Sequence, residues 1–122
     1  FGAAITTKAK RISIAVIVVL GFIVYNVAGG KYDDFAQCLG DNGAKFYGAF
    51  WCPHCIEQKD MFGSSKKYLP YIECSTPDGK SQLPICQQAG INSYPTWVFA
   101  DGTRGSVMTL EELSQKTGCA IS

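Results

Sequence analysis

The most apolar part of the chain lies close to its amino terminus. Nineteen residues, Ile12 to Gly30, carry no charge and are rich in isoleucine and valine. A helix of this length extends for about 28 Å, which just crosses the hydrocarbon core of a bilayer. Basic residues crowd the preceding flank and acidic residues follow Lys31, so the positive-inside rule keeps the amino terminus cytoplasmic. We predict a basic flank and a single transmembrane anchor over residues 1–31, in the inner or cytoplasmic membrane, with the rest of the chain outside the cytoplasm.

Two other interpretations of this segment stay open. A secretory signal peptide also has a basic start and an apolar middle, although its apolar stretch is usually shorter, about 7 to 15 residues. The small residues Ala28, Gly29 and Gly30 would suit its cleavage site. The other alternative is a buried helix of a soluble protein. Both an anchor and a signal peptide would export the domain that follows.

Residues 32–122 alternate between helical and strand periodicity, which predicts one α/β domain. Its first half should contain a short helix from Asp33 that Gly40 and an Asp-Asn-Gly turn interrupt, a buried strand over 44–51, and a polar helix that stops near Gly63. Its second half should contain a strand over 68–74, a helix over 84–89 stopped by Gly90, a strand over 96–100, an Asp-Gly turn, a partner strand from Thr103, and a last helix capped by Thr109 and Glu112.

Composition narrows the classes of function. About ninety residues remain after the predicted anchor, which is the size of one small domain. With 11 basic and 10 acidic residues the formal charge is +1, so no electropositive face is available for a phosphate backbone, and we do not expect nucleic acid as a partner. Six cysteines are more than a reducing cytosol usually leaves idle in a chain of this length. An oxidising compartment is therefore expected.

Strand, turn and helix are predicted to meet at Cys52-Pro53-His54-Cys55. A cysteine attacks a disulfide as its thiolate, and a helix amino terminus favours that form through its free N–H groups and its dipole. Pro53 suits the first helical turn, and His54 adds a cation beside the thiolate when it is protonated. Cys55 lies one helical turn further on, where it can attack and release a mixed disulfide. We predict that these four residues form the catalytic site.

Other roles for the cysteine pair remain. A structural zinc site needs four ligands, usually with a second closely spaced pair, and the only histidine of the chain lies inside the first pair. The next cysteines along the chain, Cys74 and Cys86, are twelve positions apart. A purely structural disulfide between Cys52 and Cys55 is a further alternative. We expect neither a metal nor a cofactor.

The chain resembles the thioredoxin superfamily over residues 33 to 118. The resemblance rests on the Trp51-Cys52-Pro53-His54-Cys55 segment, on the run from Gly90 to Thr96, and on the closing strand, turn, strand and helix. It implies a central mixed sheet flanked by helices. It also implies that Pro95 follows a cis peptide bond beside the redox pair, and that substrate binds along Trp51, Tyr94, Pro95 and Thr96.

The run from Phe46 to Gly63 is similar, more narrowly, to the thioredoxin-like domain associated with bacterial vitamin K epoxide reductase homologues. This similarity implies an outward-facing domain held by one transmembrane helix. It also implies that electrons pass from secreted protein thiols to a quinone-linked membrane partner. One departure is that Phe46 stands where thioredoxins carry a buried aspartate, six residues before the first active cysteine. The Pro-His dipeptide resembles that of the oxidant DsbA, and oxidation is the preferred direction.

The four remaining cysteines can pair in three ways, and the sequence alone does not choose among them. Proximity favours Cys74 with Cys86, where a bridge would brace the loop between them by about 3 kcal/mol. Cys38 and Cys119 would then join the first and last helices, although in the thioredoxin fold those helices often pack on opposite sheet faces. A buried apolar role, or a thiol kept for a partner, is the alternative for each.

These observations predict a membrane-anchored thiol-disulfide oxidoreductase that acts outside the cytoplasm on protein substrates with cysteine thiols. A membrane-held reductase or isomerase would use the same residues with the opposite flow of electrons. The alternative from another functional class is a binding module, either stapled by a zinc ion or without redox activity.

Overall fold

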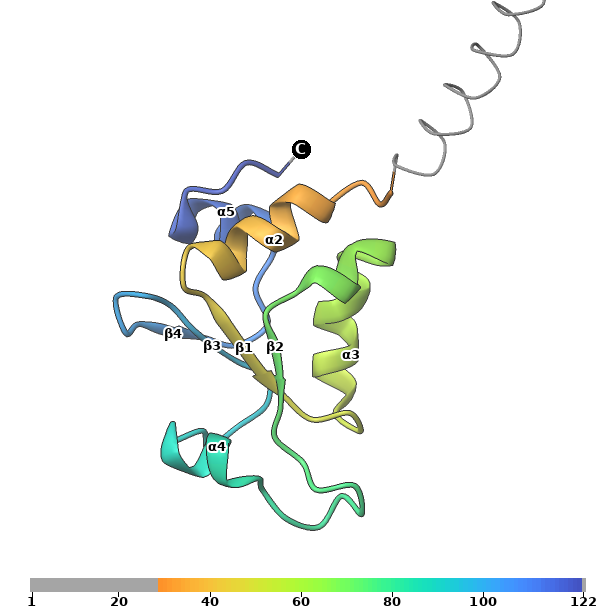
Figure 1. The fold of residues 1–122 in the computed structure, drawn as a ribbon, viewed down its shortest axis with the longest axis vertical. Coiled ribbons are helices and arrows are strands. Elements are labelled where there is room, and N and C mark those ends of the chain that lie inside the picture. The colour runs from red at the N-terminus through yellow and green to blue at the C-terminus, as the bar shows by residue number, and fades with distance from the viewer. Residues whose placement is uncertain (1–28, 122) are drawn as a thin grey trace, which may run out of the picture.

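A computed structural model describes residues 29–121 (Figure 1). The predicted transmembrane segment, except its last two residues, therefore lies outside the described residues. Within 29–121 no helix is both long and apolar enough to cross a bilayer. The elements, in chain order, are α2 (Asp33–Asp41), β1 (Lys45–Gly48), α3 (Pro53–Asp60), the 3-10 helix η1 (Gly63–Tyr68), β2 (Tyr71–Glu73), α4 (Pro84–Gln88), β3 (Thr96–Val98), β4 (Arg104–Gly105) and α5 (Leu110–Thr117).

The sheet is mixed and has the strand order β2-β1-β3-β4. β1 pairs in parallel with β2 and antiparallel with β3, and β3 pairs antiparallel with β4. Phe46 of β1 is the register partner of both Tyr71 and Trp97. The mixed sheet with helices around it confirms the predicted α/β class and fits a thioredoxin-like fold.

Two apolar clusters form the core. The larger cluster contains Phe46 and Trp97 of the sheet together with buried residues of α2, α3 and α5. The smaller cluster gathers Tyr47, Ile91 and the Cys74 and Cys86 pair, close to α4. Because successive residues of a strand point to opposite faces, Phe46 and Tyr47 enter different clusters. The first and last helices of the domain thus share one cluster, rather than packing on opposite faces as in the general expectation for the fold.

Several predicted boundaries are corrected by the structure. The first helix continues through Gly40 to Asp41 and ends at Asn42, because the left-handed backbone needed to leave it falls on Gly43 (φ 84°). The strand predicted over 44–51 stops at Gly48, since a tight turn closed by the Cys52 N–H and the Ala49 carbonyl (3.1 Å) precedes the next helix. This turn brings the cysteine segment to the end of β1.

The region after α3 also differs from the prediction. The α-helix ends at Asp60, and Gly63 begins η1 instead of ending the helix. η1 takes up the residues before Leu69, so the strand predicted over 68–74 is only Tyr71–Glu73. The capping box of α5 is confirmed: the Thr109 hydroxyl accepts from the Glu112 N–H at 3.1 Å, and the Glu112 carboxylate accepts from the Thr109 N–H at 3.3 Å.

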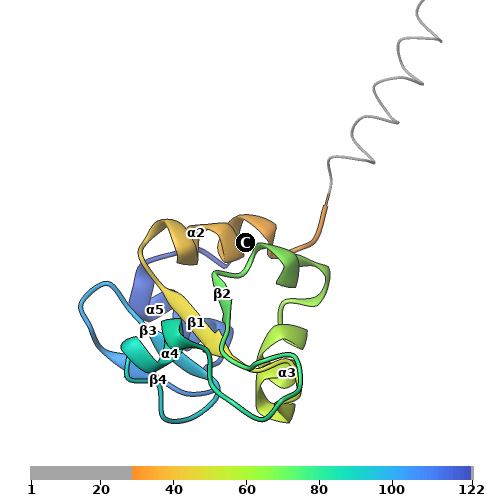
Figure 2. The same cartoon turned by 60° about the horizontal axis from the view of Figure 1, so that its bottom comes forward.

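The described chain begins at one end of the domain, and the β1–α3 connection lies at the other (Figure 1; Figure 2). The beginning lies against η1, because the Tyr32 N–H donates to the Ser65 hydroxyl at 2.9 Å. The β1–α3 connection is the segment that carries the predicted redox residues.

Candidate redox site

Cys52 occupies the N-cap of α3 and is 5% exposed. Its sulfur accepts a hydrogen bond from the Cys55 N–H at 3.3 Å, so one of the free N–H groups at the helix start is directed at the sulfur. The Cys52 thiol also donates to the Tyr94 carbonyl, with the sulfur 3.6 Å from that oxygen. The Tyr94–Pro95 peptide bond is cis. The helix start and the cis-proline loop, forty residues apart in sequence, therefore meet at Cys52.

Cys55 has a different environment from Cys52. Its side chain is fully buried, and the structure records it as a free thiol, like Cys52. Burial raises the pKa of the Cys55 thiol to about 12, and its hydrogen bond with Cys52 acts in the same direction. Cys52, which is slightly exposed, can react with an incoming sulfur, whereas Cys55 is held as a protonated thiol inside the domain.

Gly48 allows the pair to approach the sheet closely. A Cβ atom at this position would lie 2.9 Å from the Cys55 sulfur and 2.9 Å from Cε2 of Tyr71. Any larger residue would push Cys55 away from β1, so the last residue of the strand must be glycine for α3 to sit where it does.

Two aromatic side chains flank Cys52. Trp51 is 49% exposed, and its ring meets the ring of Tyr94 edge to face, with 5.9 Å between centroids. The indole N–H donates to the Ser75 hydroxyl at 2.9 Å, and the Tyr94 hydroxyl accepts from the Gln82 amide at 2.9 Å. Both rings are therefore fixed by residues of the loop between β2 and α4.

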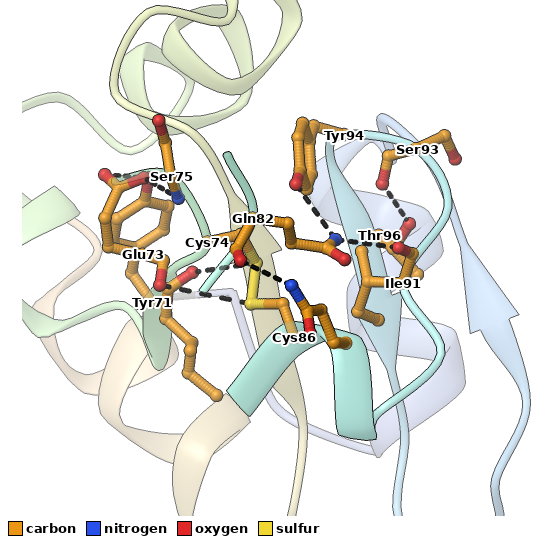
Figure 3. Close-up of a disulfide and its surroundings, with 12 residues drawn as sticks. Tyr71, Glu73, Cys74, Ser75, Gln82, Cys86, Ile91, Ser93, Tyr94 and Thr96 are labelled. Atoms are coloured by element: carbon orange, nitrogen blue, oxygen red, sulfur yellow. Dashed lines mark hydrogen bonds between the residues drawn. A yellow bond between two sulfur atoms is a disulfide. The ribbon is translucent and has the colours of Figure 1, made fainter. Parts of the chain in front are cut away.

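The same loop is closed by a disulfide between Cys74 and Cys86 (Figure 3). A second disulfide joins Cys38 of α2 to Cys119, which follows Gly118 at the end of α5. The first bridge is the pair that proximity along the chain favoured, and the second is the pair that then remained. The second is compatible with the fold because α2 and α5 contribute to the same apolar cluster.

No protein-family model matches the sequence. The chain is 44% identical over 91 residues to thiol-disulfide oxidoreductase LTO1 of Arabidopsis thaliana. This similarity, with the fold, supports a thioredoxin-like oxidoreductase family. The alignment covers 70% of this chain and 24% of the relative, so the chain spans about a quarter of the length of that protein.

The other predicted site residues are Pro53, His54, Pro95 and Thr96. Pro53 is the first residue of α3, and Pro95 is fully buried. Thr96 is also buried, and its hydroxyl donates to the Ser93 carbonyl at 2.7 Å. The His54 side chain is 72% exposed, and its Nδ1 lies 3.3 Å from a Glu57 carboxylate oxygen. Its described polar contact is therefore with an acid on its own helix.

Two polar residues of this region were not expected from the sequence, Glu73 and Gln58. Glu73 accepts from the Tyr71 hydroxyl at 2.9 Å, and Gln58 is a fully buried amide on the same helix as the cysteines. An acid within an otherwise apolar strand was the available signal for Glu73, since buried acids need partners. No comparable signal marks Gln58, whose partners lie 39 and 50 residues away.

Within residues 29–121, no cluster of three or more histidine, cysteine, aspartate or glutamate side chains is arranged to hold a metal ion.

The buried Cys55 thiol should make the reduced protein sensitive to alkali. Because its pKa in the folded chain, about 12, is above the ordinary value of 9.0, the folded state favours the protonated thiol. The stabilisation is fully present below pH 9.0 and is lost as the pH rises toward about 12. We expect the free energy of unfolding of the reduced protein to fall over this range relative to Cys55→Ser, measured by urea unfolding. Parallel curves for the two proteins would contradict this environment for Cys55.

Proposed function

We propose that this chain is a membrane-anchored, extracytoplasmic thiol-disulfide oxidoreductase that oxidises protein thiols and passes the electrons to a quinone-linked partner of the vitamin K epoxide reductase type. The observation that carries the proposal is the arrangement at the start of α3. The Cys52 sulfur is capped by the Cys55 N–H at 3.3 Å and lies 3.6 Å from the Tyr94 carbonyl oxygen. The similarity to a thiol-disulfide oxidoreductase supports redox chemistry at this pair.

The proposed oxidation begins with the Cys52–Cys55 disulfide. A substrate thiolate attacks the Cys52 sulfur, the bond between Cys52 and Cys55 breaks, and Cys55 leaves with the electron pair and gains a proton. A second substrate thiolate then attacks the substrate sulfur of the mixed disulfide, and Cys52 leaves as the thiolate. Two electrons now reside on the dithiol, and the partner disulfide removes them. The Cys55 backbone N–H, which donates to the Cys52 sulfur at 3.3 Å, stabilises the negative charge that develops on this sulfur.

The surface beside Cys52 suits an extended peptide. Trp51 and Tyr94 provide aromatic contact area, while the cis-proline segment offers its backbone next to the sulfur. We propose that substrate chains bind here. The membrane anchor and the location outside the cytoplasm rest on the Ile12–Gly30 segment and on the flanking charges. The two disulfides of the domain agree with an oxidising compartment.

A trapping experiment tests the roles of the two cysteines. Cys55→Ala removes the thiol that resolves a mixed disulfide. With Cys52 first converted to its mixed disulfide with thionitrobenzoate, the variant should accumulate covalent complexes with reduced, unfolded protein substrates, because a substrate thiolate attacks the Cys52 sulfur and thionitrobenzoate leaves. Cys52→Ala is the matched control and should accumulate none, because Cys55 is buried. The complexes are measured on non-reducing gels, and their loss after reduction with dithiothreitol shows that they are disulfide-linked. Equal trapping by the two variants, or by neither, would defeat the proposal.

The reduction potential of the Cys52–Cys55 pair tests the proposed direction of electron flow. An oxidant such as DsbA has a potential of about −120 mV, and a reductase such as thioredoxin about −270 mV. We expect the full chain to titrate near the oxidising value against glutathione. A value near that of thioredoxin would instead favour the membrane-held reductase.

A further inference from the structure

The protonated Cys55 thiol needs a proton acceptor whenever it attacks a mixed disulfide. Thioredoxins use a buried aspartate, and Phe46 stands at that position here. The structure shows the Phe46 ring fully buried, stacked on Trp97 with 4.8 Å between centroids and edge to face with Tyr71 at 5.1 Å. This side chain cannot accept a proton. Another group must therefore accept the proton of Cys55.

The titratable groups near Cys55 come from α3 and β2. Cys52 and Lys59 belong to its own helix segment, and the Lys59 ammonium lies 3.6 Å from the centre of the Tyr71 ring. From β1, the residue against Cys55 is Gly48, which carries no titratable group. From β2, Tyr71 approaches, since its Cε2 atom and the Cys55 sulfur each lie 2.9 Å from the point where a Gly48 Cβ would be.

Tyr71 in turn leads to a carboxylate. Its hydroxyl donates to one oxygen of Glu73 at 2.9 Å, and the other oxygen accepts from the Ser75 N–H at 3.0 Å (Figure 3). The same oxygen also accepts from the Phe50 N–H at 3.2 Å. Three donors thus hold the Glu73 carboxylate in one orientation behind the phenol. Of the two backbone donors, Phe50 directly precedes Trp51 and Ser75 belongs to the β2–α4 loop. The carboxylate is therefore held by the same segments that hold the redox site.

The surroundings suit proton exchange with solvent. Burial raises the pKa of Tyr71, and its hydrogen bond to Glu73 adds to the effect. The phenol therefore stays neutral, and it can accept one proton on its oxygen while it gives up the proton that it already carries. Tyr71 also lines an open surface pocket together with Lys59, Lys67 and Leu69. The Lys59 cation opposes the extra negative charge that forms when Cys55 ionises.

We propose that Tyr71 and Glu73 form a proton relay that serves Cys55 in place of the aspartate of thioredoxins. This inference rests on the proposed function. When Cys55 resolves a mixed disulfide, its proton moves to the Tyr71 oxygen while the phenolic proton moves to Glu73. The Cys55 thiolate then attacks Cys52, the Cys52–Cys55 bond forms, and the bond from Cys52 to the substrate sulfur breaks with the electron pair leaving on the substrate. In the oxidising direction, the same relay returns a proton to the departing Cys55 thiolate.

Single-turnover kinetics with the full chain and dithiobisnitrobenzoate test the relay. The reduced protein releases a first thionitrobenzoate when Cys52 attacks and a second when Cys55 resolves the mixed disulfide. We expect Glu73→Gln to slow the second release by about 100-fold at neutral pH and to leave the first nearly unchanged. The deficit should shrink as the pH rises, because hydroxide then removes the Cys55 proton in both proteins. A purely structural change at residue 73 would slow release by the same factor at every pH.

Tyr71→Phe should show the same pH-dependent deficit, and combining it with Glu73→Gln should add little, because the two groups act in one path. The matched controls are Tyr68→Phe and Glu111→Gln, which change exposed side chains of the same types. Second-release profiles of Glu73→Gln or Tyr71→Phe that match wild type would overturn the relay while leaving the proposed function intact. A wild-type chain that gives no first release would instead sink the proposed function.

Discussion

Removing the Cys38–Cys119 disulfide is expected to lower the free energy of unfolding by about 4.5 kcal/mol in Cys38→Ala/Cys119→Ala. The bridge joins residues 81 positions apart, so it encloses most of the domain and restricts the unfolded chain strongly. A domain of this size is stabilised by about 5 to 15 kcal/mol in total. The loss is therefore a large part of what keeps it folded.

The second bridge provides the matched comparison. Cys74 and Cys86 are separated by only 12 positions, and the same chain-entropy argument gives about 3 kcal/mol for Cys74→Ala/Cys86→Ala. Urea unfolding of the two double variants, with the redox pair oxidised in both, measures the difference. If the short bridge proves the more stabilising, packing around its two buried sulfurs outweighs chain entropy.

Replacing Gln58 with leucine is expected to cost about 3 kcal/mol. The Gln58 amide oxygen accepts from the Trp97 indole N–H at 3.0 Å and from the Met108 N–H at 2.7 Å, and its nitrogen donates to the Met108 carbonyl at 3.0 Å. Leucine has a similar size but satisfies none of these groups. The variant therefore leaves the Trp97 indole N–H of β3, and the N–H and carbonyl of Met108 before α5, without these partners.

Gln115→Leu is the control, because this glutamine lies exposed on α5. Its effect should stay within about 0.5 kcal/mol. Chemical unfolding of both variants gives the comparison. An equally small loss for Gln58→Leu would mean that the Trp97 and Met108 groups find other partners, and that the buried amide does not join helix to sheet.

The local parts of the site could be predicted from the sequence because neighbouring residues determine them. An apolar strand followed by cysteine and proline is typical of a strand that leads into a helix start, and the structure has β1 and α3 there. The capping box at Thr109 and Glu112 is equally local. In both cases the partners lie within a few residues, so spacing alone reveals them.

The parts that could not be predicted depend on distant residues. The apolar pattern from Tyr68 onward indicated a longer strand, but η1 packs against the beginning of the domain through Ser65 and shortens it. Gln58 looked like an ordinary polar helix residue because its partner Trp97 is 39 positions away. The Tyr71–Glu73 pair was visible as two residues on one strand face, but only the fold brings the Tyr71 ring close to Cys55.

The described chain begins on the opposite side of the domain from the β1–α3 connection, and this arrangement matters for how the protein would meet the proposed membrane partner (Figure 1). If the proposed anchor lies in the lipid and the domain stands with its first described residues toward the bilayer, the sulfurs would lie about 30 Å, one domain diameter, above the bilayer surface. At that distance from the bilayer the sulfurs could react with soluble client proteins, but they could not contact an acceptor embedded in the bilayer. Each catalytic cycle would then include a reorientation of the domain relative to the proposed anchor, a motion in the range of microseconds to milliseconds.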